Sequence, residues 1–239
     1  MSTYACSDLH GQRRLFDAIM DFLKPDDKLF YLGDAIDRGA DGWDMFKTLM
    51  DDPRVTFICG NHEDMMTDAL RTFPEFRWSR EMGVWSWNGN SPTLDAINVD
   101  DPKVVEDYLD RGRSLPVFAT YTNADGDTFW LSHAGCNYDP SNLIFSLTRE
   151  DLIWSREHFF PNEWASNNPS NLYIVHGHTP IPYLVEELAN FYEGMPEEIE
   201  PGAFYYADGH KIDIDCGAHF TGCTVLLNLD TFDEEVFVE

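Results

Sequence analysis

The residues that could do chemistry in this sequence follow short apolar runs and lie next to glycine. They are carboxylates, an amide, imidazoles and an arginine, and they occur in the segments SDLHG (7–11), GDAIDRG (33–39), GNHE (60–63), SHAG (132–135) and VHGHTP (175–180). Each segment alone is ordinary turn material. The same pattern at so many places instead indicates one shared site.

Aspartate, asparagine and histidine donors without cysteine suit borderline divalent metals, for which we expect Mn, with Fe or Zn as alternatives. Two such cations about 3.5–4 Å apart need a bridging carboxylate and terminal oxygen and nitrogen ligands. The pair binds a phosphate oxygen and lowers the pKa of a bridging water, which then attacks phosphorus in line. The donor set therefore predicts a two-metal phosphoester hydrolase.

Strands and helices alternate over the first 73 residues, and these elements must position the donors. Apolar spacing predicts strands within 2–7, 28–34 and 54–62, and helices within 11–23, 41–50 and 63–73, the second of them capped by Asp41. This alternation is typical of an α/β fold with parallel strands. Right-handed crossovers would bring the carboxyl ends of the strands, and the donors that follow them, to one edge.

The later part of the chain is predicted to be mainly β. Strands are expected within 115–122 and 128–135 around the turn NADGD, and then within 171–180, 203–217 as a second hairpin, 223–230 and 234–239. Between about 73 and 115 lies an aromatic-rich insert with a helix within 102–115, which would cover one side of the sheet edge. Its tryptophans would line a substrate groove or pack within the cover: Trp78, Trp85 and Trp87. We expect one domain over residues 1–239.

Composition limits the partners and the compartment. The formal net charge is −27, which disfavours nucleic acid and anionic membrane as partners. No apolar run approaches the roughly 18 residues of a membrane span, and no basic segment followed by an apolar one opens the chain. The five cysteines form no CxxC pair and are expected to be buried core residues in a reducing, cytoplasmic environment. None is followed six residues later by arginine, which excludes a cysteine-dependent phosphatase.

In their order, the five segments resemble the calcineurin-like metallophosphoesterases. DRG together with GNHE resembles, more narrowly, the serine/threonine phosphoprotein phosphatases and their bacterial and phage members. DCGAHFTGCTVLLNL resembles the closing strand of the family, so the resemblance covers nearly the whole chain. It implies an α/β fold, a β-sandwich of two mixed sheets flanked by helices, with the active site at the carboxyl ends of the strands.

The resemblance also implies roles for individual residues. One metal would be bound by Asp8 and His10, with Asp34 bridging to a second. The second metal would be bound by three further side chains, Asn61, His133 and His178.

The remaining roles implied by the resemblance concern the substrate. His62 would be the general acid for the leaving alkoxide, held by Asp37. Arg38 and Arg156 would bind the phosphate, for which the planar guanidinium is suited. His176 is expected to be hydrogen-bonded near its strand end rather than to bind metal, and His219, on a loop, could approach the site.

Three functions compete at this point. The first is a phosphatase for phosphoserine and phosphothreonine, acting on a phosphorylated protein or a small phosphomonoester. The second is a small-molecule hydrolase of the same fold, such as a symmetrical dinucleoside tetraphosphatase, which the negative charge disfavours. The third, a non-catalytic binding module, is opposed by the complete donor set, because unneeded buried carboxylates are costly.

Overall fold

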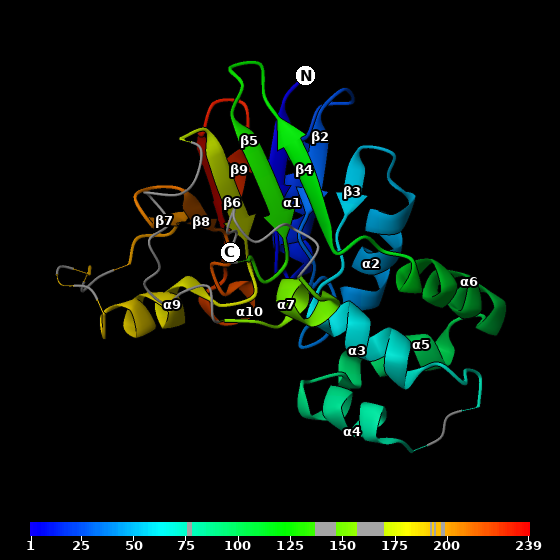
Figure 1. Cartoon of the computed structure of the whole chain (residues 1–239). Helices are drawn as coiled ribbons and strands as arrows, with labels where there is room; N and C mark the ends of the chain where they lie inside the picture. The colour runs from blue at the N-terminus through cyan, green and yellow to red at the C-terminus, as the bar shows by residue number, and fades with distance from the viewer. Residues whose placement is uncertain (76–77, 137–146, 157–169, 192, 194, 197–198) are drawn as a thin grey trace.

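Two five-stranded mixed sheets form the centre of the computed structural model, which describes residues 1–75, 78–136, 147–156, 170–191, 193, 195–196 and 199–239 (Figure 1). The strand order is β10-β9-β1-β2-β3 in the first sheet and β4-β5-β6-β8-β7 in the second. The first comprises β1 (Thr3–Cys6), β2 (Lys28–Tyr31), β3 (Val55–Phe57), β9 (Cys223–Asn228) and β10 (Glu234–Val238). The second comprises β4 (Phe118–Thr122), β5 (Thr128–Ser132), β6 (Leu172–His176), β7 (Phe204–Tyr206) and β8 (Lys211–Asp213).

The first sheet is parallel on one side and antiparallel on the other, whereas the second has a parallel centre between two antiparallel edge strands. β1, β2 and β3 run parallel, while β9 pairs with β1 and β10 in antiparallel register. β5, β6 and β8 run parallel, with β4 and β7 antiparallel at the two edges. The predicted hairpins β4–β5 and β7–β8 are therefore confirmed, as is the sandwich of two mixed sheets.

Helices flank both sheets (Figure 1). They are α1 (Arg13–Phe22), α2 (Gly42–Asp51), α3 (Asn61–Ala69), α4 (Arg80–Trp87), α5 (Ser91–Val99), α6 (Pro102–Arg113), α7 (Arg149–Ile153), α9 (Ile181–Leu188) and α10 (Ala218–Thr221). Two of them depart from the prediction in detail. Asp41 precedes α2, but its side chain makes no capping hydrogen bond, and α3 begins at Asn61 rather than at Glu63.

Side chains alternate between the two faces of each strand, and this alternation builds two cores. Ala5 of β1 lies in the core between the sheets together with Phe129 and Leu131 of β5. Its neighbours Tyr4 and Cys6 lie in the other core, between the first sheet and its helices. β1 is thus buried on both faces, so the polar residues that follow it are held at a rigid edge.

In its described residues the insert forms three helices, α4, α5 and α6, of which the predicted α6 is confirmed. Its tryptophans separate into two kinds. Trp85 is fully buried, whereas Trp78 and Trp87 are 81% and 92% exposed. Of these three tryptophans, only Trp85 therefore packs inside the insert.

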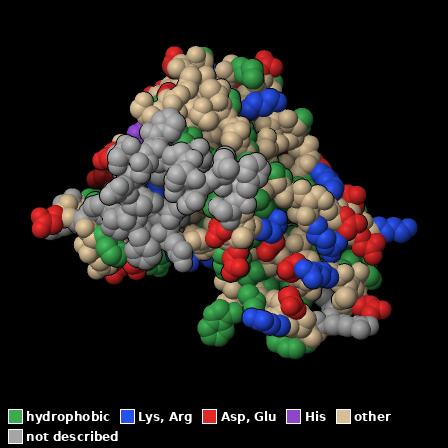
Figure 2. All heavy atoms as spheres, viewed as in Figure 1, with side chains coloured by type: hydrophobic (Ala, Val, Ile, Leu, Met, Phe, Trp, Pro, Cys, Tyr) green, Lys and Arg blue, Asp and Glu red, His purple; other side chains and the backbone are tan. Residues whose placement is uncertain are grey.

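The surface carries acidic and basic side chains intermingled over the helical side, and hydrophobic side chains project near α4 (Figure 2). All five cysteines are buried and free, as expected. Within the described ranges, every helix is too short or too polar to cross a bilayer.

Candidate active site

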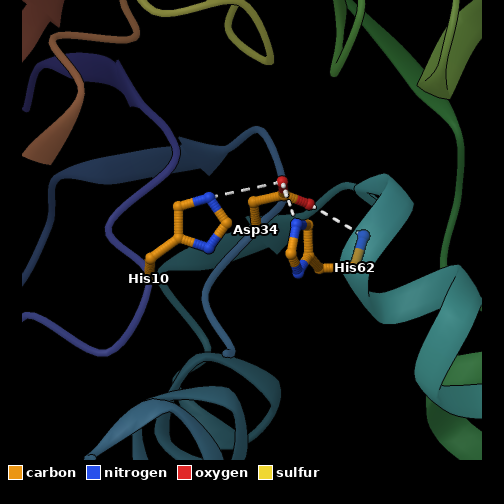
Figure 3. Close-up of side chains that lie close together, drawn as sticks. All are labelled: His10, Asp34 and His62. Carbon is orange, nitrogen blue, oxygen red and sulfur yellow. Dashed lines mark hydrogen bonds and ion pairs between the residues drawn. The ribbon is translucent and has the colours of Figure 1, made fainter. Parts of the chain in front are cut away.

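Asp34 lies at the centre of the polar cluster that follows the parallel strands. It is buried, and its Oδ2 lies 3.6 Å from His10 Nε2 and 3.8 Å from His62 Nε2 (Figure 3). Its other oxygen, Oδ1, lies 3.5 Å from His133 Nε2 and accepts a hydrogen bond from the His62 backbone N–H at 3.0 Å. One carboxylate therefore faces imidazoles on two sides.

Backbone carbonyls fix the tautomers of three of the imidazoles. A carbonyl only accepts, so the ring nitrogen beside it carries the proton and the other nitrogen presents a lone pair. The pairs are His10 Nδ1 with Ile36 O at 2.9 Å, His133 Nδ1 with Leu32 O at 2.7 Å, and His178 Nε2 with Trp154 O at 3.2 Å. Burial lowers the pKa of all three rings below the ordinary value, so each is neutral at pH 7.

Three lone pairs converge on the far side of Asp34. Asn61 Oδ1 lies 2.9 Å from His133 Nε2 and 3.1 Å from His178 Nδ1, and the two nitrogens are 3.1 Å apart. All three atoms are acceptors once the carbonyls have fixed the tautomers, so none of them supplies a hydrogen to the others. Such a set is unfavourable alone and suits a cation at its centre.

Nearby arginines only partly compensate the buried carboxylates of the cluster. Burial raises the pKa of Asp34 well above its ordinary value, and the negative charges of Asp8 and Glu63 raise it further. Burial and the charge of Asp8 likewise raise the pKa of Asp215. Oxygen and nitrogen donors without thiolate are a donor set for divalent cations such as Mn, Fe or Zn, so these residues fit a metal centre.

Two groups of side chains in the described part of the chain can hold a cation, and Asp34 belongs to both. One group is Asp34, His10 and His62, and the other is Asp34, His133 and His178. A carboxylate shared by two groups is the arrangement that a dinuclear centre needs.

Asp8 joins the two sheets at this edge. Its Oδ2 accepts a hydrogen bond from the backbone N–H of His178 at 3.0 Å. A Cβ atom at Gly177 would lie 2.1 Å from that same oxygen, so only glycine allows this approach. Asp8 therefore sets the position of His178.

Six of the candidate residues adopt the left-handed backbone conformation, which is uncommon for residues other than glycine. They are Asp8, His10, Asp34, Asp37, Arg38 and His178, with φ between 44° and 70°. Strain of this kind persists where surrounding structure holds it and is concentrated at functional sites.

A second polar group lies beside the first. His62 Nδ1 is 2.6 Å from Asp37 Oδ2, and the indole N–H of Trp85 donates to the same oxygen at 2.7 Å. The other ring nitrogen of His62, Nε2, lies 3.2 Å from the Arg38 guanidinium. A carboxylate, an imidazole and a guanidinium thus form a chain that ends next to Asp34.

This constellation has counterparts in known proteins. Residues 1–219 match the sequence profile of the calcineurin-like phosphoesterases. The chain belongs to the calcineurin-like phosphoesterase family. It is therefore an enzyme that hydrolyses phosphoesters, and the family uses a dinuclear centre of divalent metals.

Relatives of this phosphoesterase carry two different names. This chain is 27% identical over 156 residues to serine/threonine-protein phosphatase 2 of Escherichia coli K12, and the match covers 63% of this chain and 66% of that protein. It is 23% identical over 261 residues to the symmetrical bis(5'-nucleosyl)-tetraphosphatase of Nitrosospira multiformis, covering 98% and 88%. A Saccharomyces cerevisiae serine/threonine phosphatase structure has the same fold, with a TM-score of 0.57, 15% identity, and coverage of 100% and 80%.

The structure brings most of the predicted site residues of the phosphoesterase together. His10, Asp34, Asn61, His133 and His178 contribute the converging donor atoms described above. The donors expected for the first metal differ in one residue from the group that the structure forms. His62, rather than Asp8, lies with His10 and Asp34, and Asp8 instead accepts a hydrogen bond from the His178 backbone. The predicted acid is thus close enough to be a ligand.

Arg156 lies next to the segment that carries His178. Its Nε donates to Thr179 Oγ1 at 2.8 Å, and its Nη2 lies 3.5 Å from the His178 carbonyl oxygen. Burial lowers its pKa, whereas the charges of Asp215, Asp8 and Asp34 raise it. The guanidinium is therefore held at the rim, beside the acidic cluster.

Sequence reasoning missed Glu63. This buried carboxylate accepts hydrogen bonds from the backbone N–H groups of Asp34, Ala35 and Gly60 at 2.8, 2.9 and 3.0 Å. It thereby ties the loop that carries Asp34 to the start of α3. Its place in the first turn of that helix, where a carboxylate caps backbone N–H groups, is the signal that could have found it.

The expectation for His176 is confirmed, because its ring nitrogens lie 3.0 Å from Gly177 O and 2.8 Å from the Tyr206 hydroxyl. His219 does approach the site, as its predicted loop position allowed. Its Nδ1 lies 3.3 Å from the Arg38 guanidinium, and its ring packs edge-on against His10 at 5.5 Å.

Proposed function

We propose that the phosphoesterase is a phosphomonoesterase and, most specifically, a protein phosphatase for phosphoserine and phosphothreonine. The observation that carries this proposal is the chain from Asp37 through His62 to Arg38 beside Asp34. This chain of contacts supports a role for His62 as a proton donor beside Arg38 as a phosphate-binding group. We also propose that residues 1–239 act as one catalytic domain, with the insert at about 73–115 as its cover.

The metals would be held by two sets of donors that share Asp34. His10, with Asp8 or His62, would serve one ion, and Asn61, His133 and His178 would serve the other. When bound, two divalent cations supply the positive charge that offsets the phosphate and activates water as the nucleophile.

The guanidinium of Arg38 would bind phosphate oxygens. It has five N–H donors in a planar fork, and the His62 contact uses only one of them. Arg156 would supply a second fork from the rim beside Thr179. Two guanidinium groups would hold the phosphate in a fixed orientation toward the acid.

His62 would deliver a proton to the departing oxygen through Nε2. Asp37 would orient the ring through Nδ1, as a carboxylate does for a catalytic imidazole. The alkoxide of serine or threonine is a poor leaving group and needs that proton. General acid catalysis of this kind contributes about 10²–10⁴-fold to the rate.

The second candidate is a symmetrical dinucleoside tetraphosphatase. It is favoured by the relative of that name, which matches 98% of this chain, whereas the named protein phosphatase matches 63%. The net charge of −27 opposes it, because a tetraphosphate is strongly anionic.

A direct comparison of substrates separates the two candidates. Protein loaded in turn with Mn, Fe and Zn would be assayed on a phosphothreonine peptide, diadenosine tetraphosphate, an aryl phosphomonoester and an aryl phosphodiester. We expect the highest kcat/KM on the phosphopeptide with Mn. A kcat/KM at least tenfold higher on diadenosine tetraphosphate would reverse the assignment.

A further inference from the structure

Arg38 is held on two sides by imidazoles. Its Nη2 lies 3.2 Å from His62 Nε2, and its Nη1 lies 3.3 Å from His219 Nδ1. A guanidinium only donates hydrogen bonds, so Nδ1 of His219 accepts. None of the ion pairs among the described residues involves Arg38, so its charge remains available to an anion.

The backbone around Arg38 is fixed, but the side chain is long and exposed. Its φ is 64°, and its N–H donates to the Gly89 carbonyl at 3.1 Å. A flexible side chain that must become ordered when a ligand binds weakens the affinity for that ligand. Contacts that order it beforehand remove this cost.

His219 lies in the short helix α10, and a turn at Asp215 and Gly217 connects this helix to β8. Asp215 Oδ1 accepts a hydrogen bond from the Gly217 N–H at 2.8 Å, and Thr221 Oγ1 donates to the Gly217 carbonyl at 3.0 Å. Gly217 has a φ of 70°, and a Cβ atom there would lie 2.3 Å from the Phe220 ring, so the turn requires glycine. His219 therefore reaches Arg38 from a rigid support.

We propose that His219 is a positioning residue that holds the Arg38 guanidinium in place to receive a phosphate oxygen. This inference rests on the proposed phosphate-binding role of Arg38. Phosphate takes the donors of the guanidinium that His219 leaves unused, including the one that His62 Nε2 releases when that ring acts as the proton donor, and His219 makes no contact with the phosphate.

The test is a double-mutant cycle on the Mn-loaded protein, with His219→Ala, Arg38→Ala and both together. KM and kcat for an aryl phosphomonoester and the dissociation constant of inorganic phosphate, measured by calorimetry, are the readouts. We expect His219→Ala to raise KM and that dissociation constant by about 3–10-fold, the effect of one net hydrogen bond, with kcat changed less than twofold. In the Arg38→Ala background the same substitution should have no further effect.

Two further variants control for structure. His219→Asn keeps an acceptor oxygen and should recover most of the phosphate affinity. His210→Ala removes a histidine whose Nδ1 bonds the Leu172 carbonyl on the β7–β8 side, and it should leave phosphate binding unchanged. Metal content and Tm are measured for each variant, because the ring of His219 also packs on His10.

The outcomes separate this inference from the proposed function. The positioning role of His219 is overturned, while the role of Arg38 remains, by either of two results. One is that Arg38→Ala weakens phosphate binding and His219→Ala does not. The other is that His219→Ala has the same effect in the wild-type and the Arg38→Ala backgrounds. If Arg38→Ala leaves phosphate binding unchanged, both are overturned.

Discussion

The indole N–H of Trp85 and the imidazole of His62 meet at one oxygen of Asp37. The two contacts measure 2.7 and 2.6 Å, and all three side chains are buried. Trp85 belongs to α4, in the insert that covers the sheet edge, whereas Asp37 follows β2 and His62 lies in the first turn of α3. The cover is thus bonded directly to the residues proposed to supply the proton.

We expect Trp85→Phe to lower both stability and activity. A buried hydrogen bond to a charged group contributes about 1.5–3 kcal/mol, and the free energy of unfolding should fall by about that amount. Activity on a phosphothreonine peptide should fall several-fold, because Asp37 loses a group that fixes it. Denaturant unfolding and steady-state kinetics measure the two effects. Trp87→Phe, at a side chain that is 92% exposed, is the control and should stay within about 0.5 kcal/mol.

Gly177→Ala should disrupt the site, because the added methyl group would collide with both Asp8 Oδ2 and Ser7 Oγ, at 2.1 and 2.3 Å. We expect a loss of about 2 kcal/mol or more in the free energy of unfolding and a lower metal content. Gly83→Ala is the matched control. Its Cβ would have its nearest neighbour at 3.8 Å, and alanine in a helix is favoured by about 1 kcal/mol. Equal stability of the two variants would show that the approach of Asp8 to Gly177 is unimportant.

Removal of metal with a chelator should abolish phosphoesterase activity, and Mn should restore it. Asp34→Asn should be the most damaging single change of a donor, because Asp34 faces both donor groups. We expect loss of more than one equivalent of metal by mass spectrometry. Asp27→Asn changes another buried carboxylate, which binds the Ser2 and Lys24 backbone N–H groups, and it should keep both metals. Full activity of chelated protein would refute the metal mechanism.

Attack by water should leave no phosphoenzyme. A single turnover in ¹⁸O-labelled water should place one solvent oxygen in the released phosphate. This expectation reflects the donor groups gathered around Asp34, which would hold cations and leave the attack on phosphorus to water. Trapping of a phosphoryl group on the protein would contradict it.

The parts of the site that could be predicted from the sequence are those set by local rules. Asp8 and His178 are far apart along the chain, yet each follows a buried parallel strand. Parallel strands in a sandwich bring their carboxyl ends to one edge, so the residue order alone predicts that such donors meet. Hairpins around NADGD and ADGH follow from turn residues in the same way.

The remaining features depend on packing between distant segments. Trp85 reaches Asp37 only because α4 docks against α3, and no periodicity in the insert encodes that docking. His219 reaches Arg38 because Gly217 turns the chain and Asp215 holds the turn. Asp41 had the right residue type for a cap, but its side chain makes no hydrogen bond to the helix. Residue type thus predicted candidates, and tertiary contacts decided among them.

The last prediction concerns His62, which the structure places in two possible roles. Its Nε2 lies 3.8 Å from Asp34 Oδ2, within a group that can hold a cation, and its Nδ1 is bonded to Asp37. If it is the acid, His62→Asn should lose about 10²–10⁴-fold in rate on a phosphothreonine peptide but far less on nitrophenyl phosphate, whose leaving group needs no proton. Metal content should be unchanged, and Asp37→Asn should show the same pattern more weakly. Equal losses on both substrates together with loss of one metal would instead make His62 a ligand and place the acid elsewhere.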